Sequence, residues 1–266
     1  MLIIKAGGGK TINWDFIAED VKELLKKEKI ILVHGASVKR DEIAKKLGSP
    51  TKVVTSPSGV DSVYTDENAL EIFLMVYAGL VNKKIVAKLQ AYGINAVGLS
   101  GIDGKLWLAK AKKDLLIKEG TKTKLIQNNK TGRVEKINTN LISLLVDNHF
   151  LPVISAPAIS YENEIVNSDN DWATAVMAGE LGVKKLVFLF EAPGLLQDLS
   201  NESSLIRHIP KEKIEDFVVY TQGRMRKKII AAKKAFSEGV ETIYWGDGRM
   251  KKPIFNSLKG KGTVIK

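Results

Sequence analysis

Short apolar runs that end in glycine alternate with helix-like segments along the whole chain, and this alternation constrains the fold more than any other feature. The first run, LIIKA at 2–6, leads into Gly7–Gly9, and the second, at 29–35, ends at Gly35. Apolar strands that alternate with helices favour a mainly parallel sheet covered on both faces. We therefore predict an α/β fold, a three-layer αβα sandwich around a mainly parallel open sheet.

The other expected elements follow from apolar periodicity and from glycine, proline and capping residues. Further strands are expected within 51–59, 94–101, 150–159, 184–190, 240–246 and 262–265. Helices are expected at 14–27 with Asn13 as the cap, and at 39–48, 66–92, 171–182 and 224–239. Short alternating runs with turn residues between 105 and 137 predict inserted β-hairpins near the functional face.

In a sheet of this kind, ligands bind beyond the carboxyl ends of the strands. The residues expected at those ends are Gly7–Gly9, Gly35, Gly98 and Gly101, Ala156–Pro157, Glu191–Gly194 and Gly246–Gly248. Gathered at one edge, they would form an extended cleft lined by glycine.

The stretch Gly9–Lys10–Thr11 looks like the end of a Walker A phosphate loop, but Ile4 stands where that motif requires its first glycine. Glycines still allow backbone N–H groups to approach a phosphate closely, and a following helix adds its dipole. Lys5 lies two residues before the glycines and could reach into the cleft. The alternative is a tight turn beside a surface lysine.

Two further stretches carry charge at the start of an expected helix. Asp169 and Asp171 either cap their helix, as aspartate commonly does, or orient catalytic lysines. Four of the five residues at 224–228 are basic, although the helix dipole disfavours cations there. This placement suggests an anion such as a nucleotide phosphate, and the alternative is a solvated basic face.

Composition excludes several classes of protein. The 266 residues, 44% hydrophobic and 27% charged, are typical of a soluble globular protein, and no apolar run is long enough to span a bilayer. We see no signal peptide, and the absence of cysteine fits a cytoplasmic protein. The three histidines, His34, His149 and His208, are scattered, so we expect no protein metal site.

The formal net charge of +11 has three interpretations: nucleic acid, an acidic partner, or a lysine-rich solvated surface. No nucleic-acid-binding signature is present, so we expect no nucleic acid partner. Many lysines lie on helix faces, which favours the solvated surface, and an acidic partner comes next. The apolar stripe of the helix at 66–92 indicates core or a subunit contact.

Several stretches, taken together, resemble a known family in their order and spacing. They are IIKAGGGK, ILVHGAS, VVTSPSGVDSVYTDENALEIF, NAVGLSGIDG, TGRVEKI, VNSDNDWATA, RMRKKIIAAKKA and GKGTVI, which cover the chain from end to end. The family is that of the amino acid kinases, and the resemblance is closest to the acetylglutamate kinase branch. Within it, the sequence is most similar to kinases of lysine or arginine synthesis that act on aminoadipate or glutamate attached to an acidic amino-group carrier protein.

The resemblance implies transfer of the ATP γ-phosphoryl group to a side-chain carboxylate, which gives an acyl phosphate. Residues 1–166 would hold the acyl substrate and 167–266 the nucleotide, with Mg²⁺ carried largely by the phosphates. Lys5 would contact the moving phosphoryl group and Lys228, in the M-x-x-K position after Met225, the other phosphates. Asp171 would hold the two lysines in place.

The resemblance also assigns binding residues. Those matched to the acyl substrate are Gly8, Gly35, Ala36, Val63 and Asn167. Those matched to the nucleotide are Gly7, Gly8, Glu191, Gly194, Met225 and Lys228.

The sequence departs from the family pattern at several of these positions. Ala36 and Ser37 stand in place of glycines, and Arg224 replaces a glycine before Met225. Val63 replaces an arginine that clamps the substrate α-carboxylate, with Asp61 where a basic residue often precedes it. We expect free N-acetylglutamate to be a poor substrate. Either a basic side chain such as Lys39 or Arg40 replaces the clamp, or the acceptor lacks that carboxylate.

Two alternatives to the carboxylate kinase stay open at the level of sequence. One is a kinase of the same fold whose acceptor is a phosphate monoester or a carbamate, and the other is a nucleotide-binding regulatory paralogue. The resemblance suggests a homodimer through the helix at 66–92. Contacts to an acidic carrier are expected from Lys39, Arg40, Lys52 and the lysines of the 105–136 hairpins.

Overall fold

The computed structural model describes residues 1–120, 122–221 and 224–266. The α-helices are α1 (Trp14–Leu24), α2 (Ser37–Lys46), α3 (Glu67–Leu74), α4 (Asn82–Ala91), α5 (Thr139–Asp147), α6 (Asn170–Glu180), α7 (Arg224–Ser237) and α8 (Pro253–Leu258). A π-helical segment spans Met75–Val81, and 3-10 helices span Asp103–Lys105, Glu202–Ser204 and Lys211–Tyr220. None of the helices formed by these residues is long and apolar enough to cross a membrane.

The strands of the main sheet are β1 (Leu2–Ala6), β2 (Ile30–His34), β5 (Ala96–Gly101), β6 (Trp107–Lys112), β9 (Thr131–Ile137), β10 (Leu151–Ser160), β11 (Ile165–Ser168), β12 (Lys185–Phe190), β15 (His208–Ile209), β16 (Thr242–Asp247) and β17 (Thr263–Ile265). Three small sheets pair β3 (Val53–Thr55) with β4 (Asp61–Val63), β7 (Leu115–Glu119) with β8 (Lys122–Ile126), and β13 (Leu195–Leu196) with β14 (Leu205–Ile206).

The main sheet is continuous and mainly parallel. Its strands lie in the order β11-β9-β6-β10-β2-β1-β12-β16-β17-β15, and β5 pairs with β10. β1 is central, with β2 parallel on one side and β12 parallel on the other. The sheet therefore joins the two sequence halves without a break, and the predicted fold class is confirmed.

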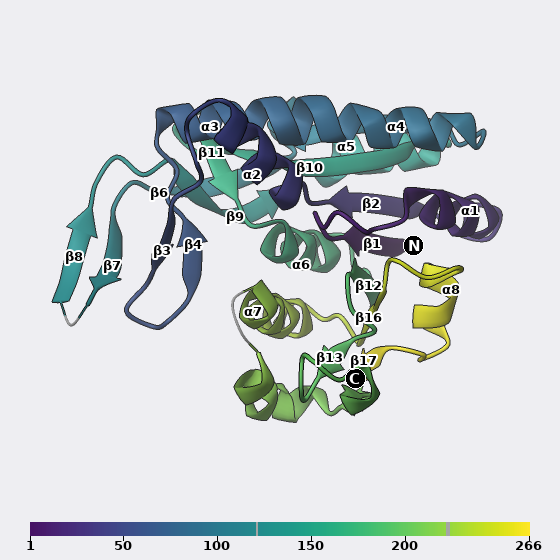
Figure 1. Cartoon of the computed structure of the whole chain (residues 1–266). Coiled ribbons are helices and arrows are strands. Elements are labelled where there is room, and N and C mark those ends of the chain that lie inside the picture. The colour runs from purple at the N-terminus through teal and green to yellow at the C-terminus, as the bar shows by residue number, and fades with distance from the viewer. Residues whose placement is uncertain (121, 222–223) are drawn as a thin grey trace.

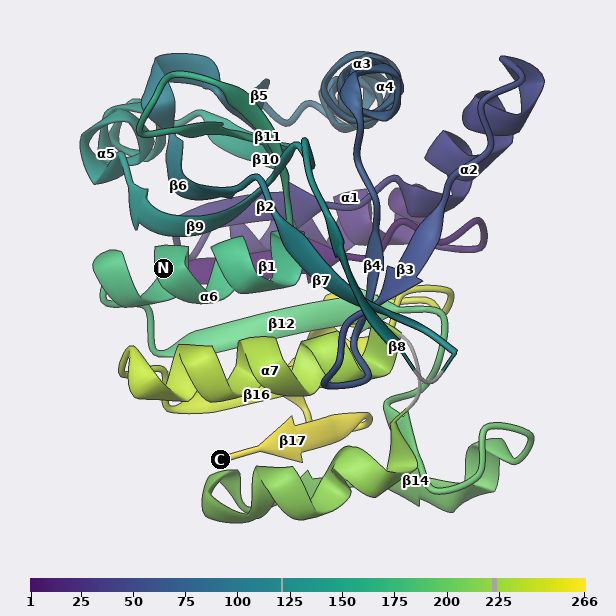
Figure 2. The same cartoon turned by 90° about the vertical axis from the view of Figure 1, so that its left-hand side faces the viewer.

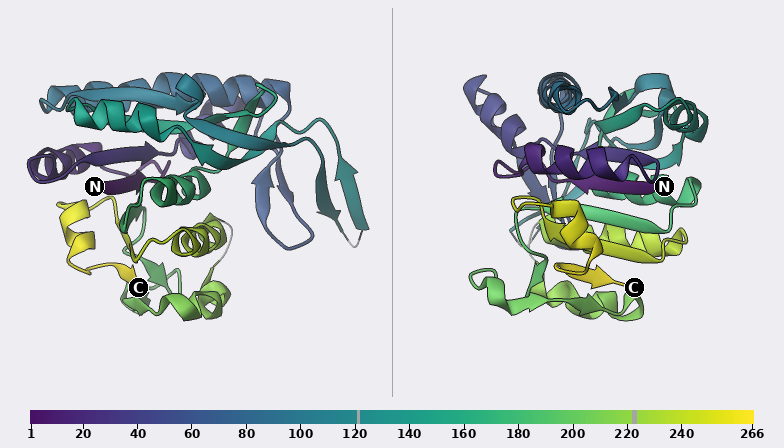
Figure 3. Two further views of the ribbon diagram at one scale, coloured as in Figure 1. Left: turned by 180° about the vertical axis from the view of Figure 1, so that it is seen from behind. Right: turned by 90° about the vertical axis from the view of Figure 1, so that its right-hand side faces the viewer.

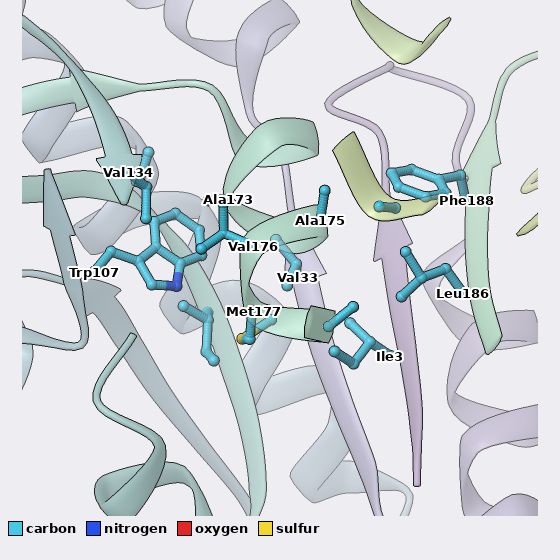
Figure 4. Packing of buried hydrophobic residues seen from close by; sticks show 14 of the residues in the cluster. Ile3, Val33, Trp107, Val134, Ala173, Ala175, Val176, Met177, Leu186 and Phe188 are labelled. Atoms are coloured by element: carbon cyan, nitrogen blue, oxygen red, sulfur yellow. The ribbon is translucent and has the colours of Figure 1, made fainter. Parts of the chain in front are cut away.

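Helices cover both faces of this sheet (Figure 2). The alternating residues Leu2, Ile4 and Ala6 of β1 pack in a cluster that includes residues of α1, α4 and α8. Ile3 lies in the other cluster, with residues of α6 and α7. Figure 4 shows Ile3 and Val33 beside α6, whose Ala173 and Ala175 have small side chains that allow the helix to lie close to the strands.

The predicted hairpins are present and have two different placements. β6 pairs with β9 and extends the main sheet, whereas β7 pairs only with β8. Both β7–β8 and β3–β4 project from the body on the same side, as Figure 1 and the rear view in Figure 3 show. These two hairpins therefore form an arm-like extension beside the molecule.

The helix predicted at 66–92 is a continuous run of α3, the π-helical segment and α4, with Asp66 as its N-cap. Helix α5, helix α8, and the short strands and 3-10 turns between 195 and 220 have no counterpart in the predicted elements. α5 and α8 are short, and the segment 195–220 has no sustained apolar period.

Candidate active site

Three buried charged side chains from three elements meet beyond the end of β1. Asp171 Oδ1 lies 2.5 Å from Lys5 Nζ, and Lys228 Nζ donates to Asp171 Oδ2 at 2.8 Å. Lys5, Asp171 and Lys228 are 6%, 7% and 9% exposed. One carboxylate thus holds two ammonium groups in a site that is almost closed to water.

The pKa of each of these three groups is shifted in a direction set by burial and by the neighbouring charges. Burial lowers the pKa of Lys228, and the nearby charge of Lys5 lowers it further, so this lysine is the more acidic of the two. Burial also opposes the charged form of Lys5, but Asp171 holds the pKa of Lys5 above its ordinary value. Although burial opposes its ionisation too, the two lysines hold the pKa of Asp171 well below its usual range.

Local structure explains why these side chains meet. Lys5 shares the face of β1 on which Ile3 packs against α6, because alternate strand residues point the same way. Asp169 caps α6 by accepting from the N–H groups of Asp171 and Trp172 at 2.9 and 3.0 Å. Asp169 is therefore the helix cap, and the Asp171 carboxylate is left to pair with the lysines. The two roles that the sequence left open, capping the helix and orienting the lysines, thus belong to different aspartates.

Two glycine-containing loops lie against each other next to the lysines. The N–H of Gly7 donates to Leu189 O, that of Gly35 to Ala6 O, and that of Val38 to Gly8 O. A Cβ on Gly8 would lie 2.4 Å from Ser37 N and 2.5 Å from Ala36 N, so only glycine fits there. The backbone of Gly8 thus lies against the N–H groups of Ala36 and Ser37, and N–H groups gathered in a loop of this kind can bind anions.

Glu191, in the loop after β12, contacts the glycine-containing loop after β1. Its Oε1 accepts from Thr11 N at 2.7 Å and Thr11 Oγ1 at 2.6 Å, and a Cβ on Gly9 would overlap its carboxylate. The contact joins the loop after β1 to the loop after β12. The sequence analysis named Thr11 only within the stretch that resembles a phosphate loop. It did not predict the contact of Thr11 with Glu191.

The remaining residues matched to the nucleotide lie further along the second half. Gly194 has no room for a side chain beside Thr263 of β17. Met225, on the first turn of α7, packs at the edge of the core. The side chain of Arg224 lies outside the described residues.

On the other side of the lysines, Asn167 Nδ2 donates to Thr65 Oγ1 at 2.9 Å. Thr65 and Val63 line a small cavity together with Arg40. Ala36 is buried in the core and Gly35 continues β2, so neither lines this cavity. Asp61 accepts from Thr55 Oγ1 at 2.7 Å on the β3–β4 hairpin and does not line the cavity either.

Other residues that the sequence did not single out support the loop after β2. Asn170 Nδ2 donates to His34 O at 2.8 Å, and its Oδ1 accepts from Ala156 N. Asn82 Nδ2 lies 3.0 Å from His34 Nε2 and donates to Val153 O. Burial lowers the pKa of His34 to about 4, so the ring is neutral.

No group of three His, Asp or Glu side chains within 1–120, 122–221 and 224–266 could hold a metal ion. The positive charges of Lys5 and Lys228 and the backbone N–H groups near Gly8 suit an anion instead. The arrangement can position and neutralise phosphate oxygens.

Comparison with characterised proteins points in the same direction. LysW-aminoadipate kinase of Thermus thermophilus is 42% identical over 269 residues, covering all of both chains. LysW-aminoadipate kinase of Deinococcus radiodurans is 45% identical over 266 residues, covering all of this chain and 91% of the relative. A LysW-aminoadipate/LysW-glutamate kinase of Saccharolobus solfataricus is 32% identical over 268 residues, covering all of this chain and 99% of its own.

Solved structures share the fold at lower identity. N-acetylglutamate synthase of Neisseria gonorrhoeae superposes with a TM-score of 0.79 at 22% identity, over 99% of this chain and 58% of that one. Carbamate kinase of Giardia lamblia superposes with a TM-score of 0.66 at 15% identity, over 99% and 98%. The model of the amino acid kinase family matches residues 1–244. On these grounds, with its central parallel sheet, the chain belongs to the amino acid kinase family.

Proposed function

We propose that this protein transfers the γ-phosphoryl group of ATP to the side-chain carboxylate of an aminoadipate or glutamate whose amino group is attached to an acidic carrier protein. A carboxylate oxygen attacks the γ-phosphorus, the bond from that phosphorus to the ADP oxygen breaks, and the products are an acyl phosphate and ADP. The observation that carries the proposal is the ion triad of Lys5, Asp171 and Lys228 beside the Gly8 loop.

The triad suits phosphoryl transfer because this reaction needs positioning and charge stabilisation rather than a covalent nucleophile. Lys5 would neutralise the transferred group, and Lys228 would neutralise the remaining phosphates. Asp171 holds both ammonium groups, so they need not reorganise during the reaction. Exclusion of water strengthens each of these interactions.

The two halves of the chain would bind different substrates. Residues 1–166 would bind the acceptor, through Asn167 at their boundary and the loops at Gly8 and Gly35. Residues 167–266 would bind ATP, through Glu191, Gly194, Met225 and Lys228. Mg²⁺ would be held mainly by the phosphates and would neutralise their charge.

Of the candidate acceptors, a carrier-linked amino acid is favoured by the relatives. The aminoadipate kinases are 42% and 45% identical to this chain, whereas carbamate kinase of Giardia and an isopentenyl phosphate kinase are 15% and 16% identical. A regulatory paralogue is disfavoured, because binding alone does not require a buried triad of this kind.

The carrier would bind on the projecting hairpins. Lys52, beside β3, and Lys118, Lys122 and Lys124 of β7–β8 are exposed on this arm, and Val53, Leu116 and Leu125 place apolar surface among them. The prediction that Arg40 contacts the carrier is wrong, since Arg40 is only 7% exposed. Lys39 is partly exposed and pairs with Glu42 at 2.9 Å.

Two further proposals concern assembly and location. A homodimer would form along α3, the π-helical segment and α4, where Met75 is 53% exposed. A biosynthetic kinase that uses ATP would work in the cytoplasm. Light scattering at several concentrations tests the dimer, and disruption by Met75→Glu would support this face.

The decisive test measures ATP turnover with aminoadipate and glutamate, each free, N-acetylated and attached to a carrier protein. Hydroxylamine traps an acyl phosphate as a hydroxamate, which separates carboxyl transfer from other phosphorylation. We expect hydroxamate with the carrier-linked acids. Turnover of a phosphate monoester or carbamate, without hydroxamate from any carboxylate, would overturn the proposal.

A further inference from the structure

The two hairpins of the arm, β3–β4 and β7–β8, are joined to each other where they leave the body of the molecule (Figure 1). Thr65 follows β4, and Asn129 lies between β8 and β9. The N–H of Lys130 donates to Thr65 O at 2.7 Å, and the N–H of Thr65 donates to Asn129 Oδ1 at 3.3 Å. Thr65 and Asn129 are each only 1% exposed. Buried hydrogen bonds therefore connect the roots of the two hairpins.

Asn129 also closes the root of the β7–β8 hairpin. Its Nδ2 donates to Lys112 O, at the end of β6, at 2.8 Å and to Thr131 Oγ1, at the start of β9. Its backbone N–H donates to Lys113 O at 2.8 Å. Both Nδ2 protons and Oδ1 are thus engaged, which fixes the position of this buried amide. Asn129 in turn fixes the N–H of Thr65.

The side chain of Thr65 makes the contact to the acceptor side. Asn167 Nδ2 donates to Thr65 Oγ1 at 2.9 Å, and Thr65 Oγ1 donates its one proton to Val63 O at 3.2 Å. Because that proton is engaged, the Asn167 atom that faces Thr65 must be the donor Nδ2 and not the oxygen. Among the described residues, no group donates to Asn167 Oδ1. The orientation of the amide is therefore set by Thr65, and its oxygen is left for a ligand.

The same junction also holds the backbone of Asn167. Its N–H donates to Lys130 O at 2.8 Å, next to the bond from Lys130 N to Thr65 O. Asn167 lies near the end of β11, and Asp169, two residues further on, caps the helix that carries Asp171. The roots of the arm are thus connected to the segment that leads into the triad.

We propose that Thr65, held in place by Asn129, is a positioning residue that fixes the Asn167 amide for the acceptor. The inference rests on the proposed function and deepens it, because the arm on which the carrier would bind and the amide that would contact the acceptor share one buried junction. An amide whose orientation is fixed before binding loses less conformational freedom when the acceptor binds. Thr65 acts through Asn167 and is not itself a catalytic residue.

The test is a double-mutant cycle on Thr65 and Asn167. Thr65→Val keeps nearly the same shape and removes the hydroxyl. We expect it to lower kcat/KM for the carrier-linked acid about five- to tenfold, the size of one lost hydrogen bond, and to leave the Kd for ATP within twofold. Thr65→Ser, which retains the hydroxyl, should recover most of the loss. In the Asn167→Ala background, Thr65→Val should have no further effect, because the two residues act as one unit.

Each variant is measured by kcat/KM and by the calorimetric Kd of the carrier-linked acid, so the comparison does not depend on residual turnover. Asn129→Ala should reproduce part of the loss, about two- to fivefold, and only while Asn167 is present. Thr242→Val is the matched control, because Thr242 begins β16, at the end of the parallel strands opposite the triad.

Two results would overturn the inference and leave the kinase standing. One is an unchanged kcat/KM and Kd in Thr65→Val, and the other is the same fold-loss with and without Asn167, which would assign Thr65 a role in folding alone. Melting temperatures of all variants accompany the cycle. If the unmodified protein forms no hydroxamate from any carboxylate, on or off the carrier, the proposed function fails and the inference with it.

Discussion

The triad and the Arg40 cavity are both buried and charged, but they differ in how completely their charges are paired. In the triad, both oxygens of Asp171 have a lysine, and the three elements that carry the triad are part of the packed core. In the cavity, Arg40 is paired on one edge only and faces open volume. The difference teaches that burial alone does not decide whether a charged side chain is fully paired.

The largest effect is expected from the triad. Lys5→Ala should lower kcat by a factor of about 10²–10³ or more, because charge stabilisation of the transition state is lost. Steady-state turnover with the carrier-linked substrate measures this, and thermal unfolding checks the fold. Lys10→Ala, exposed on the same loop, is the matched control. Near-normal turnover of Lys5→Ala would show that the triad does not stabilise the transition state.

A smaller loss, of about tenfold to a hundredfold in kcat/KM, is expected from Gly8→Ala. The added methyl group would overlap the backbone at Ala36 and Ser37 and push the two loops apart. Gly79→Ala is the control, because nothing lies within 4 Å of its added Cβ. The measurement is kcat/KM and the melting temperature of Gly8→Ala and Gly79→Ala. An unchanged kcat/KM in Gly8→Ala would show that the loops are not part of the site.

The hairpin arm should affect KM alone and by a few-fold to tenfold. Exposed charges are screened over about 10 Å at 0.1 M salt, so KM for the carrier-linked substrate should rise with ionic strength. Changing Lys118, Lys122 and Lys124 together to Gln should raise KM at low salt and flatten that dependence. Lys26→Gln, which pairs with Glu23 on the body, is the control. A KM independent of salt would argue against an electrostatic contact.

The smallest effect concerns His34, the last residue of β2, whose ring lies beside Asn82. Its pKa falls from 6.5 to about 4 on folding, so the unfolded chain binds the extra proton between these values. Stability is then full above pH 6.5 and declines as the pH falls towards 4, by at most about 3 kcal/mol. Denaturant unfolding from pH 4 to 7 measures this decline.

His34→Gln should flatten the pH dependence in that range, although burying glutamine there lowers stability at every pH. His208→Gln, at an exposed position, should leave it unchanged. The same slope in His34→Gln as in the unmodified chain would assign the effect to other groups.

The sequence predicted much of the fold because its central strands are uninterrupted apolar runs bounded by glycine. Local patterns indicated Lys5, Asp171 and the basic start of α7 separately, and only the family resemblance implied that Asp171 holds both lysines. Their contact depends on how α6 and α7 lie over β1, which no local pattern encodes. The burial of Arg40 was not predicted, because α2 reads SVKRDEIAKK and only Arg40 and Ala44 of it are buried. A helix so rich in charge gives no apolar stripe from which to tell its inner face.

The π-helical segment Met75–Val81 makes one place in the long helix tolerant of a change in length. A π turn closes a longer ring than an α turn, so it takes up an extra residue. Phe73 and Tyr77 on one side of it belong to one core cluster, whereas Ile85 and Leu89 beyond it belong to the other. Losing one residue within the segment would restore α geometry and keep both sets of contacts, whereas losing one residue within α4 would rotate the residues beyond it by about 100°.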